Sequence, residues 1–255
     1  NRTSFMYALD RLGYRGYYDI YDVQGYGNTN NSVGGRATVA QANGYALIIQ
    51  DCGRSDNTIN VPDGSDLDAQ KVNQALWYQN YLAGGLTGRA GTATVWMIGE
   101  NTAYEKSTNA LFTTYMGLAT IANDQGLAVS PDITGVASAT TWDGCSMNFA
   151  GDLFSLAGGC PFVRAYDAAT ATGTAVITHK YKAGATVGNG AIIINKNAGL
   201  KWNTVWQGFG WFDIRNAAGT PSNPDPAIKL MQKVLNCVLP LNCRQSPNVT
   251  DVGDD

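Results

Sequence analysis

The sequence predicts an α/β domain in which helices cover both faces of a mostly parallel sheet. Three observations support it: strands and helices alternate over the first half, 44% of the 255 residues are hydrophobic, and no apolar run approaches the roughly 20 residues of a membrane-spanning helix. Such a chain can bury one substantial core. Only 15% of the residues are charged and the formal net charge is −3, which argues against a nucleic-acid-binding or polybasic membrane-surface protein.

The first half of the chain predicts a helix followed by alternating strands and helices. Apolar residues at helical spacing predict the first helix over residues 4–13, and Gly13 ends it. Ser65 can cap a later helix that Gly84 terminates. The predicted order after the first helix is strand 17–23, strand 45–50, helix 66–83, strand 93–98 and helix 103–123.

The second half predicts short strands joined by loops, which we interpret as an antiparallel extension of the sheet. Residues 174–181 and 190–195 are expected to form a hairpin. A final helix is predicted over residues 226–237. We expect one domain over residues 1–243 and an acidic linker or tail over residues 244–255. The predicted strands are 133–138, 161–167, 174–182, 190–195 and 203–209.

Five cysteines and a polar, lysine-poor composition predict a secreted protein in an oxidising compartment. The spacing favours two local disulfides, Cys145 with Cys160 and Cys237 with Cys243, and leaves Cys52 over. The alternative is that these cysteines are reduced core thiols. Because the chain begins without Met and shows no signal peptide, we expect a processed piece of a larger extracellular or cell-surface protein.

Several predicted strands end in glycine or polar residues. Together with the first helix and the helix ending at Gly84, they define the layout of the chain. They are Tyr18-Asp19-Ile20-Tyr21-Asp22-Val23, Tyr45-Ala46-Leu47-Ile48-Ile49-Gln50, Val95-Trp96-Met97-Ile98-Gly99-Glu100-Asn101 and Asn203-Thr204-Val205-Trp206-Gln207-Gly208-Phe209-Gly210-Trp211. In layout, most of residues 4–238 resembles the class I glutamine amidotransferase-like fold, in the divergent form found in large secreted bacterial multidomain proteins. The resemblance implies a flavodoxin-like three-layer sandwich with a mostly parallel sheet.

The chain departs from that family at three places. Catalytic members carry a nucleophilic cysteine in a glycine-flanked turn, where this chain has Asn101, and a histidine after the last strand, where residues 208–213 contain none. The resemblance therefore implies no amidotransferase activity, because nucleophile and base are both missing. The family's first strand is also missing, so we expect it either upstream in a precursor or donated by another polypeptide as an added strand.

A weak catalytic candidate lies where two predicted strands end. Cys52 and Asp51 follow strand 45–50, and Glu100 follows strand 93–98, so all three belong to the sheet edge where α/β proteins bind ligands. Arg54 and Asn101 are candidate binding residues at the same edge, and Arg54 can lower the pKa of the thiol. The competing interpretation is an unreactive, half-buried cysteine.

Other candidate binding residues are aromatic or ionisable. Trp142 with Asp143, together with other tryptophans, can offer stacking faces for a sugar. His179 lies in a predicted hairpin strand and is expected to be a surface polar residue. We expect no metal ion and no cofactor, because the acidic clusters lack the spacing of calcium loops and the glycine-rich segments lack that of phosphate loops.

These observations favour a non-catalytic structural or accessory domain that serves adhesion or assembly, for example as the subunit of a surface polymer. Its expected partners are other domains of the same polypeptide or neighbouring subunits, with neither nucleic acid nor a membrane span. Two alternatives stay open: a hydrolase with a non-standard site near Cys52 and Glu100, and a glycan-binding module.

Overall fold

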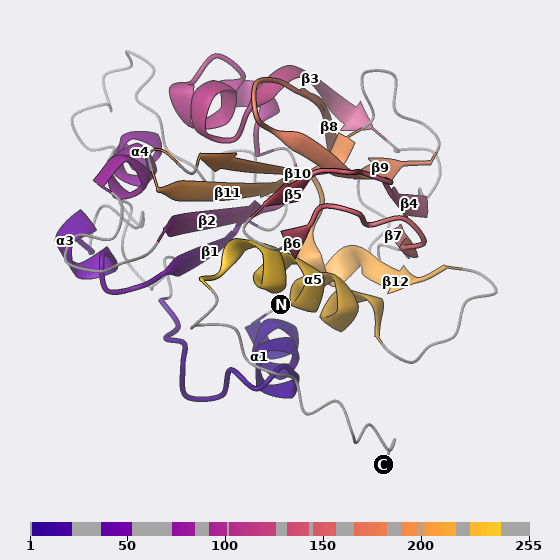
Figure 1. Ribbon diagram of the computed structural model, residues 1–255, viewed down its shortest axis with the longest axis horizontal. Coiled ribbons are helices and arrows are strands. Elements are labelled where there is room, and N and C mark those ends of the chain that lie inside the picture. Colours follow the sequence, from indigo (N-terminus) through magenta and orange to yellow (C-terminus); the bar gives the residue numbers. More distant parts are fainter. Residues whose placement is uncertain are drawn as a thin grey trace.

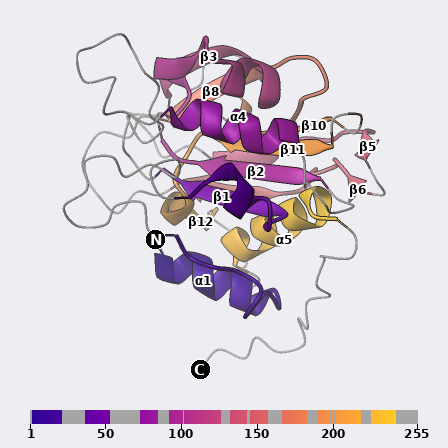
Figure 2. The same ribbon diagram turned by 90° about the vertical axis from the view of Figure 1, so that its left-hand side faces the viewer.

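A curled sheet forms the centre of the computed structural model, with helices on both of its faces (Figures 1 and 2). Helices α1 (Arg2–Arg11) and α5 (Pro226–Val238) lie on one face, and α4 (Gln74–Gly84) lies on the other. The residues that the structure describes are 2–21, 37–52, 73–84, 92–100, 102–125, 132–142, 145–156, 166–182, 190–197, 199, 201–217 and 225–240.

The main sheet contains ten described strands, and its principal order is β1-β2-β11-β10-β9-β4-β7-β12. Strand β3 pairs with β8, and β8 pairs with β10. Strands β5 and β6 form a separate hairpin. The bounds of the strands are β1 Leu47–Asp51, β2 Ala93–Ile98, β3 Leu118–Gln125, β4 Asp132–Gly135, β5 Thr141–Trp142, β6 Cys145–Ser146, β7 Leu153–Leu156, β8 Tyr166–Ala171, β9 Val176–Tyr181, β10 Gly190–Asn197, β11 Trp202–Gln207 and β12 Ile214–Asn216.

The expected flavodoxin-like sandwich with a mostly parallel sheet is wrong. Within the described strands, only β1 with β2 and β2 with β11 pair in parallel, and the other pairings are antiparallel. Alternation of strands and helices in the first half predicted parallel neighbours. In the structure, the long strand β10 lies next to β11 and pairs with it in antiparallel orientation. The antiparallel strands therefore form most of the sheet rather than an extension at its edge.

The helix predicted over residues 103–123 is also wrong. That segment contains the short helices η2 (Tyr104–Lys106) and η3 (Leu111–Tyr115), and then strand β3. Gly117 separates them with a φ of +67°, which few residues other than glycine adopt. A Cβ at Gly117 would lie 2.5 Å from the Cβ of Ala175, so the close packing of this turn also requires glycine.

The other predicted elements agree with the structure to different extents. Strand 93–98 coincides with β2, the hairpin over 174–181 and 190–195 is β9 with β10, and the last helix is α5. Residues 17–21 of the expected strand 17–23 form no strand, and residues 22 and 23 lie outside the described chain. The described part of the helix expected over 66–83 is α4, and the acidic tail over 244–255 is likewise outside the described residues.

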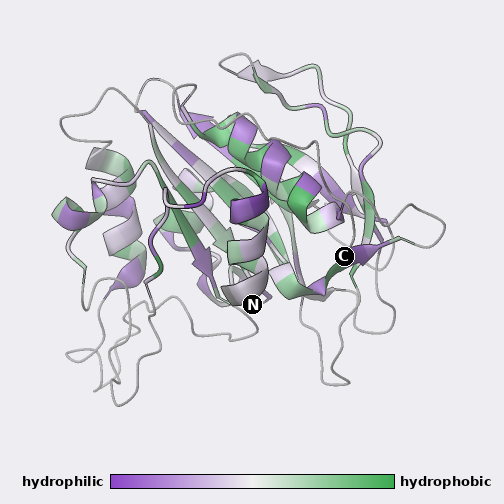
Figure 3. Cartoon of the chain, turned by 90° about the horizontal axis from the view of Figure 1, so that it is seen from below, coloured by the Kyte–Doolittle hydropathy of each residue, from purple (hydrophilic) through white to green (hydrophobic). Residues whose placement is uncertain are grey.

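Two apolar clusters occupy the two faces of the sheet. Trp96 and Ile98 of β2 belong to the cluster under α1 and α5, while Val95 and Met97 belong to the cluster under α4. This alternation explains why β2 is a continuous apolar run. Figure 3 views the face under α1 and α5, where polar and apolar residues alternate along the covering helices. None of the described helices has both the length and the apolar character needed to cross a membrane.

A disulfide joins Cys145 on β6 to Cys237 on α5. The expected local pairs, Cys145 with Cys160 and Cys237 with Cys243, are therefore not the ones formed by these two cysteines; Cys160 and Cys243 lie outside the described residues. Contact between α5 and the β5–β6 hairpin brings the two Cα atoms to 5.1 Å, within the range that a disulfide needs. The packing of α5 on the β5–β6 hairpin, rather than the spacing of cysteines along the chain, therefore determines which cysteine pairs with Cys145.

The Cys145–Cys237 bond should stabilise the fold strongly, because it closes a long loop of the unfolded chain. The two residues are 92 positions apart, and closure of a loop of that size corresponds to about 4.6 kcal/mol of free energy of unfolding. Replacing both residues with serine should lower the stability by up to that amount in guanidinium titrations. A non-reduced digest should contain a peptide pair joining 145 to 237, and a 145–160 pair would contradict the structure.

Candidate functional site

The predicted catalytic candidates lie at the carboxyl ends of the parallel strands. Asp51 pairs with Ile98 at the end of the β1–β2 ladder, and the amide of Cys52 donates to the carbonyl of Ile98 at 2.7 Å. Glu100 follows β2 after one glycine and is buried. Arg54 and Asn101 lie outside the described residues. The structure thus places Asp51, Cys52 and Glu100 at one edge of the sheet.

Cys52 is not presented as a nucleophile. It is only 4% exposed, and burial raises the pKa of its thiol far above the ordinary value. The Asp51 carboxylate raises this pKa further, whereas a hydrogen bond from Gln50 and the charge of Lys106 oppose the shift. A reactive cysteine needs an accessible thiol whose pKa is lowered, and the surroundings of Cys52 act in the opposite direction.

Trp142 lies away from this edge. The Nζ atom of Lys196 is 5.9 Å from the centre of the Trp142 ring. Lys196 pairs with Asn203 near the amino end of β11, whereas Cys52 and Glu100 follow the carboxyl ends of β1 and β2. Asp143 is outside the described residues. The other five tryptophans, at positions 77, 96, 202, 206 and 211, are buried, so they offer no sugar-stacking surface.

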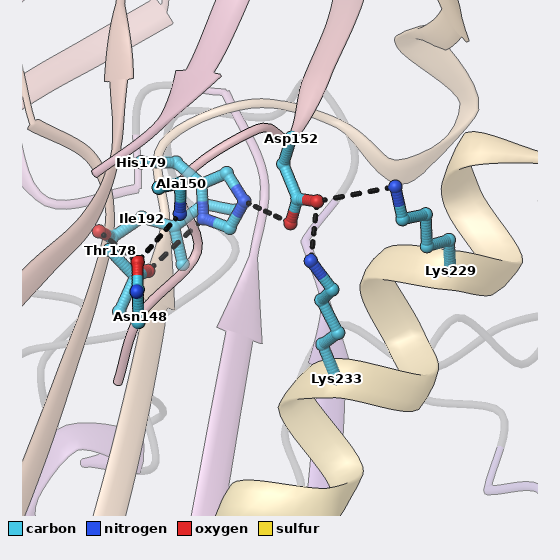
Figure 4. Close-up of polar contacts among 8 residues, drawn as sticks. All are labelled: Asn148, Ala150, Asp152, Thr178, His179, Ile192, Lys229 and Lys233. Carbon is cyan, nitrogen blue, oxygen red and sulfur yellow. Dashed lines mark hydrogen bonds and ion pairs between the residues drawn. The ribbon is translucent and has the colours of Figure 1, made fainter. Parts of the chain in front are cut away.

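A cluster of charged groups lies between α5, β9 and the loop before β7 (Figure 4), and the sequence did not predict it. We define the Asp152 cluster as Asp152, His179, Lys229 and Lys233. Oδ1 of Asp152 accepts from Nζ of Lys233 at 2.5 Å and lies 3.4 Å from Nζ of Lys229. Oδ2 of the same carboxylate lies 3.4 Å from Nε2 of His179. The Asp152 carboxylate therefore contacts three basic side chains.

The loop that carries Asp152 is held against β4. The amide of Gly135 donates to the carbonyl of Asp152 at 2.9 Å, and the amide of Phe149 donates to the carbonyl of Val136 at 3.1 Å. A Cβ on Gly135 would come within 1.8 Å of the carbonyl oxygen of Phe149, so only glycine allows the loop to pass this closely. The backbone thus places the carboxylate between β9 and α5.

His179 is fully buried, so the expectation of a surface polar residue is wrong. The ring of Phe149 lies 4.9 Å from the His179 ring, and that of Phe154 lies 5.8 Å away. Its Nδ1 atom is 3.1 Å from the hydroxyl oxygen of Thr178. The hairpin strand β9 is central in the sheet, between β10 and β4, which is why a polar residue on it is covered. Sequence spacing gave no signal for this cluster, because Asp152 and His179 match no motif.

The cluster perturbs the pKa values of both titrating partners. Burial favours the neutral acid of Asp152, but hydrogen bonds from His179 and Lys233 and the charge of Lys233 outweigh it and lower the pKa to about 2. Burial lowers the pKa of His179, and contact with Asp152 only partly opposes this. The ionised carboxylate and the neutral imidazole are therefore the favoured forms. In the described part of the chain, no group of three or more His, Cys, Asp or Glu residues is arranged to hold a metal ion.

A second feature is the outer edge of β1. Among the described residues, β1 pairs on one side only, with β2. Four large side chains beside this edge are strongly exposed, and the hydroxyl of Tyr45 donates to the carboxylate of Asp19, which fixes segment 17–21 next to the start of β1. We define the β1 edge surface as β1 together with Tyr17, Ile20, Tyr21 and Tyr45, which are 73%, 42%, 45% and 43% exposed.

Comparison with solved structures finds proteins of similar fold, among them two from Salmonella typhimurium. Cytoplasmic protein STM1381 from Salmonella typhimurium LT2 is 12% identical with a TM-score of 0.52, and the match covers 92% of this chain and 87% of that protein. Cytoplasmic protein STM3548 from Salmonella typhimurium is 14% identical with a TM-score of 0.52, covering 91% and 86%. No protein-family model and no curated protein matches the chain.

These comparisons correct two expectations. The resemblance to the class I glutamine amidotransferase-like fold is wrong, because the structural neighbours are other proteins and the sheet is mostly antiparallel. The secreted, extracellular or cell-surface location is contradicted by the names of both neighbours, which call them cytoplasmic proteins. The location was inferred from the polar, lysine-poor composition, the cysteine spacing and a first residue other than Met, and none of these is a targeting signal.

The burial of Cys52 predicts slow alkylation in the folded protein. Iodoacetamide near neutral pH should label Cys52 far more slowly than it does in guanidinium, because both accessibility and thiolate content are low. Mass spectrometry of the peptide containing Cys52 measures this directly. Folded-state labelling at the rate of the unfolded chain would contradict the buried placement and revive the hydrolase alternative.

The Asp152 cluster predicts a loss of stability in acid. Because the folded-state pKa of Asp152 lies below its ordinary 3.8, its carboxylate stabilises the fold above that pH, and this contribution is lost as the pH falls through about 2. Asp152→Asn should therefore cost about 1–3 kcal/mol of unfolding free energy at neutral pH, and the difference should shrink in acid. Urea titrations at several pH values check this.

Asp132→Asn is the matched control, because Asp132 pairs with the exposed Lys182 at 3.4 Å and accepts from the hydroxyl of Ser155 at 2.6 Å, a bond that the amide oxygen of asparagine can still accept. Such a surface pair is worth about 0–1 kcal/mol. An equal cost for the two variants at neutral pH would show that the Asp152 cluster is no stronger than a surface ion pair.

Proposed function

We propose that this domain is a non-catalytic assembly module that pairs the outer edge of β1 with the same edge of a second copy of the chain. The observation that carries the proposal is that, among the described residues, β1 pairs with a strand on one side only. Residues 44–50 contain neither a charged residue nor a proline, and exposed aromatic and aliphatic side chains flank them. Monomeric proteins usually protect sheet edges with charges, prolines or bulges.

The ladder with β2 determines which backbone groups of β1 face outward. The carbonyl of Ala46 accepts from the amide of Thr94, and the amide of Cys52 donates to the carbonyl of Ile98. Bonding alternates along a parallel strand, so the even-numbered residues of β1 bond to β2. The amide and carbonyl groups of Leu47 and Ile49 therefore point away from the sheet.

Other edges of the sheet are protected. Strand β12 has only three residues, and the exposed Arg215 is one of them. Strand β3 pairs with β8 through two register shifts, and irregularities of this kind hinder regular pairing with another strand. Among the described strands, this contrast singles out β1 as the edge best suited to regular pairing with another strand.

The proposed occupant is a second copy, because the edge complements itself. Antiparallel pairing about Ile49 makes the outward amide and carbonyl groups of Ile49 face those of Ile49 in the other copy, so donors meet acceptors there, and it places each Leu47 opposite Asp51. Asp51 is the single charged residue of β1, and in this register it meets a leucine rather than a like charge. A two-fold arrangement of this kind closes as a dimer.

Sedimentation velocity over a concentration series tests the proposal on the full chain. The wild type should form a dimer, and Leu47→Pro should weaken it, because proline removes an outward N–H from each copy and spares the bonds to β2. The loss of two hydrogen bonds corresponds to about 2 kcal/mol, or roughly 30-fold in the dissociation constant.

A second variant tests the flanking side chains without changing the strand. Ile20→Lys combined with Tyr21→Lys should also weaken the dimer, whereas Leu76→Lys on α4, at a similarly exposed position, should leave it unchanged. A wild type that stays monomeric at its highest soluble concentration would falsify the proposal. A dimer that withstands both β1 edge variants would show that another surface mediates association.

A further inference from the structure

The N-terminal arm of the chain ends beside the β1 edge surface. We define the arm as residues 2–21, which comprise α1 and the segment after it. Helix α1 lies against α5 (Figure 2), and its residues Ala8 and Leu12 are 2% and 3% exposed. The ring of Phe5 stacks on that of Trp211 at 4.6 Å. The helix of the arm is therefore docked by apolar packing.

The segment after α1 is held differently. It forms no strand, and none of its residues is buried. Tyr17, Ile20 and Tyr21 are 73%, 42% and 45% exposed. Two glycines with positive φ, Gly13 at +83° and Gly16 at +82°, turn the chain between α1 and this segment. The segment therefore depends on polar contacts, rather than on burial, for its position.

Two bonds between a tyrosine and an aspartate supply these polar contacts. The hydroxyl of Tyr18 donates to the carboxylate of Asp10 on α1 at 2.9 Å, which ties the segment to the helix. The hydroxyl of Tyr45, two residues before β1, donates to the carboxylate of Asp19. Hydrogen bonds to an ionised carboxylate are stronger than bonds between neutral groups. We call the two bonds the tyrosine clamp.

The register of the proposed dimer brings the clamped segment close to the second copy. Leu47 and Ile49 pack against the apolar cluster under α1 and α5. Side chains alternate along a strand, so those of Tyr45 and Asp51 belong to the same face. Pairing about Ile49 places Leu47 opposite Asp51 of the second copy. Tyr45 is then a diagonal neighbour of that aspartate, at a spacing of about 7–8 Å that aromatic side chains can bridge.

We propose that the tyrosine clamp is the positioning device of the dimer: it holds Tyr17, Ile20 and Tyr21 of each copy against the end of β1 in the other copy. This inference rests on the proposed pairing of β1. The clamp bonds form within one copy, so they add no contact between copies. They act by ordering the segment before association, which removes the entropy loss of ordering it at the interface. Asp10 and Asp19 are therefore positioning residues.

Sedimentation velocity on the full chain tests the clamp through the dissociation constant of the dimer. Tyr45→Phe keeps the aromatic ring and loses the clamp bond, so it should weaken the dimer roughly tenfold, with both copies contributing. Asp19→Ala should have a similar effect, and the double variant should cost no more than either single variant, because both remove the same bond. Tyr104→Phe is the matched control, since Tyr104 is similarly exposed on η2 and should leave the dimer unchanged.

A second measurement follows the order of the segment apart from association. In the Leu47→Pro background, where pairing is weakened, ¹⁵N relaxation should give residues 17–21 backbone order parameters close to those of α1. Adding Tyr45→Phe should lower the order parameters of residues 17–21 and leave those of α1 and the free energy of unfolding nearly unchanged, because the clamp bond is exposed.

The outcomes separate this inference from the proposed function. A clamp variant that loosens residues 17–21 but keeps the dissociation constant of the wild type would overturn the inference and leave the pairing of β1 standing. Unchanged order in residues 17–21 would overturn it as well. A wild type that stays monomeric would overturn the proposed function, and the inference would fall with it.

Discussion

Burial of both faces of β2 and β11 is the constraint on which the rest of the structure depends. Every described side chain of these two strands is buried. Strands of this kind must be covered on each side, because their apolar surface is otherwise exposed to water. One side is covered by α1 and α5, and the other by α4 and η3 together with the β3–β8 pair. The helices and the outer strands are placed by this requirement.

A set of buried polar bonds joins the parallel strands to the antiparallel ones. The carboxylate of Asp167, at the start of β8, accepts from the amides of Ala103 and Tyr104, and its own amide donates to the carbonyl of Gly208. The hydroxyl of Tyr181 donates to the carbonyls of Asp167 and Gly208. Buried polar groups destabilise the fold unless they are hydrogen-bonded. These contacts therefore fix the loops that follow β2 and β11 against β8 and β9.

Local sequence patterns predicted the elements whose environment is local. Strand β2 is a continuous apolar run, and α5 carries a clear apolar face, so both were predicted within a residue or two of their bounds. Residues 118–125 were missed because they contain alanines that also suit a helix, and only the turn at Gly117 and pairing with β8 decide for a strand. Tertiary pairing outweighs propensity there.

The candidate site depended on contacts that no local pattern encodes. Asp51, Cys52 and Glu100 could be placed at one edge, because the ends of parallel strands meet there. The Asp152 cluster instead brings together a loop, a hairpin strand and the last helix, and the Cys145–Cys237 bond joins distant segments. Both the cluster and the disulfide depend on the order of the strands in the sheet. The alternation of strands and helices along the sequence predicted that order incorrectly.

The packing of α1 against α5 positions the segment that flanks β1. Helix α1 lies against α5, and Phe5 stacks on Trp211 at 4.6 Å, so α1 is held by the same face of the sheet. The hydroxyl of Tyr18 donates to Asp10 of α1, and Asp19 in turn accepts from Tyr45 beside β1. The position of segment 17–21 therefore follows from the position of α1.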